Sequence, residues 1–157
     1  MKHIVGWLFL GFSVTVCAAN RLPIIDMHLH ALPADGQGPP PLAMCTPMKS
    51  PAWDPQQSYP ELFMGMAKQP PCDDPVWSPE TDAEVMAQTI EIMQRRNIVG
   101  VLSGTPERVK EWRAAAPGRF LPGIGFMIGN KREYPVETLR QLHEEGRLAG
   151  FAEITNQ

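Results

Sequence analysis

The stretch IIDMHLH, residues 24–30, is the first segment of the chain that combines β-branched residues with regularly spaced polar ones. It places Asp26, His28 and His30 at alternate positions, and it holds two of the four histidines in the sequence. Because successive side chains of a strand point to opposite faces, these three would share one face and the apolar residues between them the other. The stretch therefore predicts a β-strand with two imidazoles on a single face.

Two imidazoles at this spacing are typical of a metal site. Positions i and i+2 of a strand lie roughly 6.6 Å apart, at about 3.3 Å per residue, so His28 and His30 can lean onto one divalent cation. Zinc is the expected ion, and the same donors suit manganese, iron or cobalt. Asp26 is a candidate to orient a ligand histidine from behind. The alternative is a pair of hydrogen-bonded histidines with a structural role.

Regular alternation of helical and β-branched segments begins at Ser78. Helices are expected over 78–97, 105–116 and 134–146, and strands over 98–104, 119–128 and 148–155. Ser78 and Thr105 are the expected N-caps of the first two helices, and Gly146 is the expected C-cap of the third. This order predicts right-handed βαβ units and a parallel sheet. Two architectures remain open, a small open α/β sheet and the first half of a barrel that normally needs about 250 residues.

Between the first strand and the first helix lies a proline-rich stretch, residues 31–77. Its prolines interrupt regular hydrogen-bond ladders, so it is predicted to be one long irregular loop. Loops of this length often cover a functional site, and its aromatic residues, among them Trp53 and Trp77, are expected to wall an apolar substrate. A plain linker is the alternative.

The N-terminal residues 1–19 are interpreted as a signal peptide. Lys2 precedes an uncharged apolar run, and small residues ending at Ala19 offer a cleavage site. Cleavage would leave residues 20–157 in the periplasm or outside the cell, with no stable membrane insertion. An uncleaved anchor is one alternative, although the run is shorter than the roughly 20 residues that span a bilayer. A lipoprotein signal at Cys17 is another, disfavoured by Val16 before it.

The remaining cysteines indicate a disulfide, and the net charge argues against nucleic acid as a partner. Export would leave Cys45 and Cys72 as a pair in an oxidising compartment, which favours a disulfide across 72 − 45 = 27 positions; two free thiols are the alternative. The formal net charge of −3 lacks the basic footprint of a nucleic-acid binder. A hydrophobic fraction of 43% permits a packed core.

IIDMHLH followed by βα alternation resembles the start of the amidohydrolase superfamily, in its amidohydrolase-related branch. The resemblance covers residues 23–157 and implies the first four strands of a TIM-type (β/α)8 barrel. It implies that His28 and His30 bind the catalytic metal, usually zinc. The stretch LAGFAEIT resembles the fourth-strand segment of related barrels, which maps Glu153 as a third ligand. For Glu153 an ion pair with an arginine is the alternative.

The same resemblance implies a reaction. A metal-activated water would hydrolyse C–N or ester bonds of a small-molecule substrate, with an aspartate beyond Gln157 as general base, so this chain would carry an incomplete site. A metal-dependent decarboxylase of the same superfamily is the first alternative. A non-catalytic exported fragment or binding module, or an inactive remnant, is the second. Neither the substrate nor the oligomeric state follows from the sequence.

Overall fold

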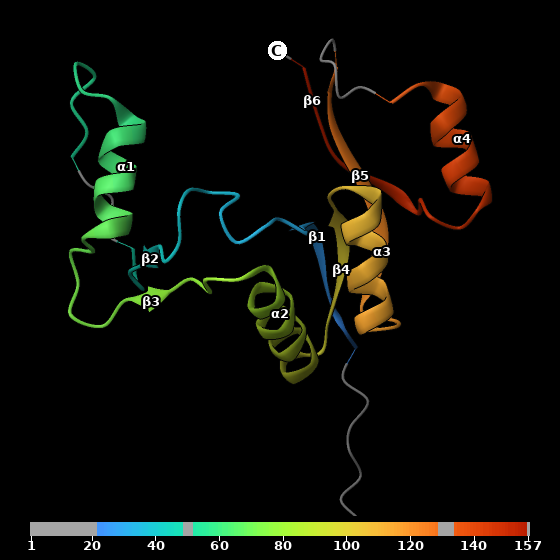
Figure 1. Ribbon diagram of the computed structural model, residues 1–157, viewed down its shortest axis with the longest axis horizontal. Coiled ribbons are helices and arrows are strands. Elements are labelled where there is room, and N and C mark those ends of the chain that lie inside the picture. The colour runs from blue at the N-terminus through green and yellow to red at the C-terminus, as the bar shows by residue number, and fades with distance from the viewer. Residues whose placement is uncertain (1–21, 49–51, 129–133, 157) are drawn as a thin grey trace, which may run out of the picture.

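The computed structural model describes residues 22–48, 52–128 and 134–156. Four parallel strands form its main sheet in the order β1-β4-β5-β6. The strands are β1 (Ile24–His30), β4 (Ile98–Ser103), β5 (Phe120–Ile128) and β6 (Gly150–Asn156), and the helices between them are α2 (Asp82–Arg96), α3 (Pro106–Ala115) and α4 (Val136–Glu144). The sheet curls so that β1 also approaches β6 (Figure 1). This α/β half-barrel agrees with part of a TIM-type barrel, as the sequence predicts.

The start of α2 differs from the sequence prediction. Thr81, not Ser78, is the N-cap: its hydroxyl accepts the backbone N–H of Glu84, and the Glu84 carboxylate accepts the N–H of Thr81. This reciprocal capping box satisfies two N–H groups of the first turn, which a cap at Ser78 would leave for water. The Ser78 hydroxyl instead accepts the N–H of Leu42, which connects the segment before α2 to the proline-rich stretch of residues 31–77.

The other helix ends follow the sequence closely. Thr105 caps α3 through the N–H of Arg108, with Pro106 in the first turn, as expected. The C-cap of α4 is Glu145, and the expected terminator Gly146 lies one residue later with φ 67°. That left-handed conformation suits glycine, because a Cβ disfavours it.

The core lies between the sheet and the helices on its outer face. Its larger cluster joins β4, β5, α2 and α3, and its members are Ala31, Met93, Leu102, Val109, Trp112, Ala116 and Phe120. A smaller cluster of Ile124, Leu142 and Leu148 packs α4 against β5. Leu102 is completely buried, so the carboxyl end of β4 is held firmly.

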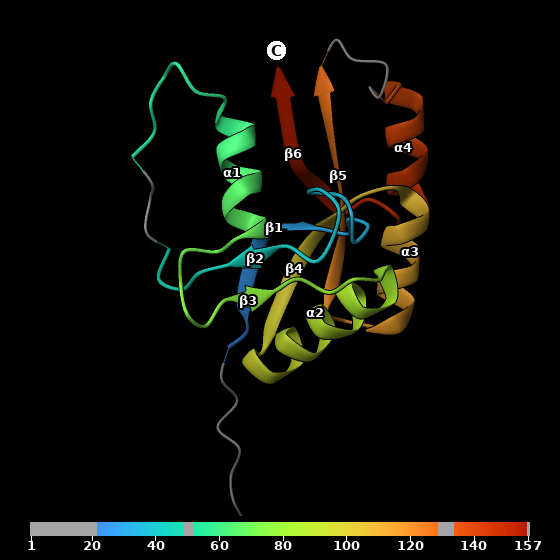
Figure 2. The same cartoon turned by 60° about the vertical axis from the view of Figure 1, so that its left-hand side comes forward.

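The insertion over residues 31–77 is more ordered than the sequence predicts. It contains the helix α1 (Tyr59–Lys68) and two short antiparallel strands, β2 (Ala43–Met44) and β3 (Val76–Trp77). The spacing of the prolines allows α1 to form. Pro60 occupies the first turn of this helix, where proline is tolerated, and the residues that follow it in the helix include no proline. These elements lie to one side of the sheet in Figure 1, and in the turned view of Figure 2 β2 and β3 are seen in front of β1 and β4.

The cysteines of the insertion are joined. A disulfide connects Cys45, next to β2, with Cys72, beyond the end of α1, and closes a loop of 27 positions. The expected signal peptide, residues 1–19, lies outside the described residues. Among the residues that the structure does describe, no helix is long and apolar enough to cross a membrane.

Candidate metal centre

His28, His30 and Glu153 meet at the carboxyl-terminal edge of the curled sheet. Nε2 of His28 lies 2.8 Å from Nε2 of His30. Oε2 of Glu153 lies 3.5 Å from the former nitrogen and 3.4 Å from the latter. Two strands at opposite ends of the sheet order, β1 and β6, thus supply three converging donor atoms. This is the group that the sequence pointed to.

The donor triangle has the size of a metal coordination site. Tetrahedral zinc with bonds of about 2.05 Å separates its ligand atoms by about 3.3 Å. An octahedral ion with bonds of about 2.1 Å separates neighbouring ligand atoms by about 3.0 Å. The three observed edges, 2.8, 3.4 and 3.5 Å, bracket both values. Two imidazole nitrogens and one carboxylate oxygen are also a donor set that suits zinc and other divalent transition metals. The residues therefore fit a divalent metal ion.

Both ligand-bearing strands carry a β-bulge close to these residues. Between Asp26 and Leu29, β1 advances by three residues while β4 advances by two. Between Phe151 and Glu153, β6 advances by two residues while β5 advances by one. Bulges re-aim side chains and are frequent beside active sites. Strict alternation along either strand, the basis of the sequence prediction, is interrupted at this point.

Asp26 acts on the backbone of β1. Its Oδ1 accepts the N–H of His28 at 2.9 Å, within the bulged part of the strand. A carboxylate that accepts an N–H two residues ahead stabilises a local turn of the chain. Asp26 therefore helps to shape the backbone that carries His28. From the sequence it is expected to orient a ligand histidine, whereas the contact seen is with the backbone N–H of His28.

Ser103 is the functional residue that the sequence analysis missed. Its Oγ lies 2.8 Å from Nδ1 of His30 and donates to the backbone oxygen of Leu29 at 3.3 Å, and the residue is only 2% exposed. A hydroxyl has one proton. When Ser103 donates that proton to the backbone oxygen of Leu29, the Nδ1–H of His30 is the donor to Oγ. Nε2 of His30 then carries a lone pair, and this atom lies 2.8 Å from Nε2 of His28 in the donor triangle. A polar residue that ends the apolar strand 98–103 was the available signal.

An open cleft adjoins the candidate metal centre. Its volume is ≈ 980 Å³, and His30, Ser103 and Glu153 line it together with residues from the loops after β1, β4 and β5. Of the insertion, only Ala31, Leu32 and Pro33 are among the cleft-lining residues that the structure describes. Trp53 and Trp77 are both half exposed and do not line it. The expected cover by the aromatic residues of the insertion is not seen in the described part of the chain.

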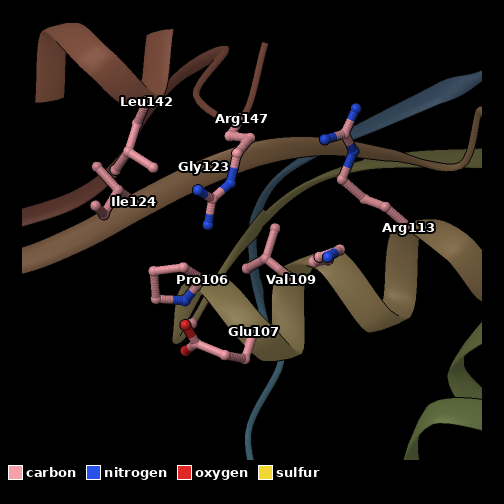
Figure 3. Close-up of a pocket in the computed structure, with 10 residues that line it drawn as sticks. Pro106, Glu107, Val109, Arg113, Gly123, Ile124, Leu142 and Arg147 are labelled. Atoms are coloured by element: carbon pink, nitrogen blue, oxygen red, sulfur yellow. The ribbon is translucent and has the colours of Figure 1, made fainter. Parts of the chain in front are cut away.

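A second cavity, of ≈ 340 Å³, lies between α3 and α4 on the outer side of the sheet (Figure 3). Glu107 is the acidic residue in its lining, beside the cations Lys110, Arg113 and Arg147. Among the described residues, the lining contains no histidine or cysteine, the usual nitrogen and sulfur donors of a transition-metal site. His143 of α4 lies elsewhere, with its Nδ1 3.1 Å from the backbone oxygen of Leu148.

The fold and the site define a class of (β/α) proteins: a parallel βα half-barrel with a His-x-His pair on its first strand, a facing glutamate on its fourth and room for a metal ion among them. Comparison with known families agrees. The amidohydrolase family matches residues 25–151, and the chain belongs to this family. No match was found among curated proteins or among solved structures. Divalent metals are general in this family, and the His28–His30–Glu153 group offers a place for one.

Proposed function

We propose that this protein is a metal-dependent hydrolase that acts on C–N or ester bonds of a small-molecule substrate. The observation that carries the proposal is the convergence of donor atoms of His28, His30 and Glu153 within 4.8 Å of one another, beside an open cleft that His30 and Glu153 line. Active sites of (β/α) barrels lie at this carboxyl-terminal face, because the loops after the strands gather there. The amidohydrolase family match supports the same class of reaction.

The residues of the chain would divide the work as follows. His28, His30 and Glu153 would hold the metal ion, most readily zinc. A divalent metal held there would supply Lewis-acid chemistry: it would lower the pKa of a water molecule towards about 7 and polarise a carbonyl. The Ser103 hydroxyl fixes the His30 ring so that Nε2 faces the metal position. Asp26 holds the β1 backbone at His28.

Export is part of the proposal. Residues 1–19 would be removed, and residues 20–157 would work in the periplasm or outside the cell. The Cys45–Cys72 disulfide supports this, because disulfides persist in oxidising compartments. N-terminal sequencing of the protein recovered from its native host should give Asn20 as the first residue. Recovery of the intact N-terminus from the cytosol would contradict export.

The reaction is tested on the full-length protein after removal of its metal with a chelator. Panels of simple amides, esters and carboxylic acids are then incubated with and without added zinc, manganese or cobalt. The proposal predicts metal-dependent release of acid from an amide or ester. Metal-dependent release of carbon dioxide with no hydrolysis would make the protein a decarboxylase instead. Turnover in neither panel, with any of the metals, would favour a non-catalytic exported binding module.

A further inference from the structure

Arg108 is the charged residue of the cleft that the metal chemistry does not use. Among the described residues that line the cleft, His30 and Glu153 belong to the candidate metal centre, and Arg108 is the remaining one with a formal charge. It lies in the first turn of α3, and its side chain is 27% exposed. A partly buried cation beside a reaction centre requires a structural or a binding role, because burial of an unused charge is unfavourable.

A single ion pair positions this guanidinium. Nη2 of Arg108 lies 2.5 Å from Oδ2 of Asp82, and Oδ1 of Asp82 accepts the backbone N–H of Ala34 at 2.7 Å. The N–H of Ala34, followed by Arg108, lowers the pKa of Asp82, which keeps that carboxylate ionised. Asp82 itself does not line the cleft. Arg108 is therefore tethered from outside the cleft.

The tether leaves most of the guanidinium available. Guanidinium has five N–H donors in a planar fork, and within the described part of the chain the Asp82 contact is the one bond that the Arg108 side chain makes. The fork matches the two oxygens of a carboxylate better than a lysine ammonium does. A salt bridge that only tied α3 to α2 would not require its cation to face the cleft that holds His30 and Glu153.

We propose that Arg108 binds a carboxylate group of the substrate, so that the enzyme acts on anionic, carboxylate-bearing amides or esters. This inference rests on the proposed function, because it names the substrate of the same cleft. The carboxylate would lie at the Arg108 side, and the bond to be cleaved would lie next to His30 and Glu153. Arg108 is thus a residue of substrate specificity.

Binding without turnover tests the proposal independently of catalysis. Benzoate, its neutral counterpart benzamide and phenyl phosphate are titrated into metal-free full-length protein, so that no metal can hold the anion. Arg108→Gln should weaken benzoate binding about tenfold or more, the loss of a charge-assisted pair, and leave benzamide unchanged. Arg108→Lys keeps the charge and the Asp82 partner, so its benzoate affinity should lie between those of the wild type and Arg108→Gln. If Arg108→Gln does not fold, the benzoate affinity of Arg108→Lys relative to the wild type is the test.

A matched control removes an arginine elsewhere. Arg95→Gln eliminates an exposed guanidinium of α2 that pairs with Glu91, and it should bind benzoate as the wild type does. Equal benzoate affinity in the wild type, Arg108→Gln and Arg108→Lys overturns the proposal. Phenyl phosphate that binds far more tightly than benzoate, and loses that affinity in Arg108→Gln, overturns the carboxylate assignment in favour of a phosphate.

A kinetic arm separates this inference from the proposed function. The metal-loaded protein is given 4-nitrophenyl esters of butanoic acid and of glutaric acid, the second of which ends in a free carboxylate. The wild type should prefer the anionic ester in kcat/KM, and Arg108→Gln should lose that preference. Hydrolysis of both esters with no Arg108-dependent preference overturns the substrate class alone. Arg108-dependent benzoate binding with no metal-dependent hydrolysis of any ester or amide overturns the hydrolase and keeps the carboxylate site.

Discussion

The Ser103 hydroxyl lies 2.8 Å from Nδ1 of His30, which joins the buried carboxyl end of β4 to a candidate metal ligand on β1. Through this contact the tightly packed strand β4 holds the imidazole ring of His30 on the more exposed strand β1. Outer partners of this kind fix the ring and the tautomer of a ligand histidine. The candidate metal centre therefore depends on three strands, although only two of them carry the donor atoms.

Ser103→Ala should weaken metal binding about 10- to 100-fold and cost about 1 kcal/mol of stability. The ring of His30 loses the acceptor for its Nδ1–H, so Nε2 no longer points steadily at the metal position. Competition titration with a zinc chelator measures the affinity, and ¹⁵N NMR of the metal-free protein reports the tautomer of His30. Ser78→Ala, which removes a hydroxyl that accepts the N–H of Leu42 in the insertion, is the control and should retain full affinity. Identical zinc affinity in both variants would refute the role of Ser103.

Glu153→Gln keeps the shape of the side chain and removes its charge. Loss of this anionic donor should reduce metal affinity by more than about tenfold, since even outer partners of a ligand contribute that much. The measurement is the same chelator competition. Glu144→Gln, on the exposed end of α4, changes the net charge equally and should have no effect. A metal affinity that responds to both substitutions alike would reflect net charge and not coordination.

Gly125→Ala should disturb the same ligand through the backbone. A Cβ at Gly125 would lie 3.0 Å from the backbone oxygen of Glu153, so β6 has to shift where it carries the carboxylate. At Gly150, the first residue of β6, a Cβ would meet nothing within 4 Å. Gly125→Ala is expected to bind metal more weakly than Gly150→Ala, while both stay folded by circular dichroism. The reverse order of affinities would contradict the bulge geometry at Glu153.

The capping box of α2 predicts a pH dependence of stability. The side-chain hydroxyl and then the backbone N–H of Thr81 lower the pKa of Glu84 below its ordinary value of 4.5. A carboxyl whose pKa is lower in the folded state contributes stability above pH 4.5, and this contribution is lost as the pH falls through the folded-state value. Urea unfolding should therefore show Glu84→Gln to be less stable than the wild type at pH 7, with a difference that shrinks as the pH falls below 4.5. A constant difference across this range would contradict the assignment.

The order of elements could be predicted from the sequence because local signals carry it. β-branched runs alternate with capped helical segments, and Thr105 and Gly146 mark ends that the structure confirms to within a residue. The group of His28, His30 and Glu153 could be anticipated only with the family resemblance, since Glu153 lies 125 positions after His28 (153 − 28 = 125). Nothing local in the sequence indicates that β1 and β6 approach each other.

The remaining features depend on long-range packing. The two bulges follow from the register against neighbouring strands, which alternation along a single strand does not encode. The Ser103 contact crosses from β4 to β1, 73 positions apart in sequence. The insertion was predicted as irregular because its prolines were counted together, whereas their spacing leaves room for α1.

The most direct test of the central claim is the zinc content and affinity of the full-length protein in three forms. The wild type and His143→Ala, whose imidazole lies on α4 away from the triad, should each bind about one zinc ion per chain. The double variant His28→Ala, His30→Ala should bind none at the same free zinc concentration. A double variant that retains the zinc content and affinity of the wild type would contradict the metal centre and the hydrolase built on it.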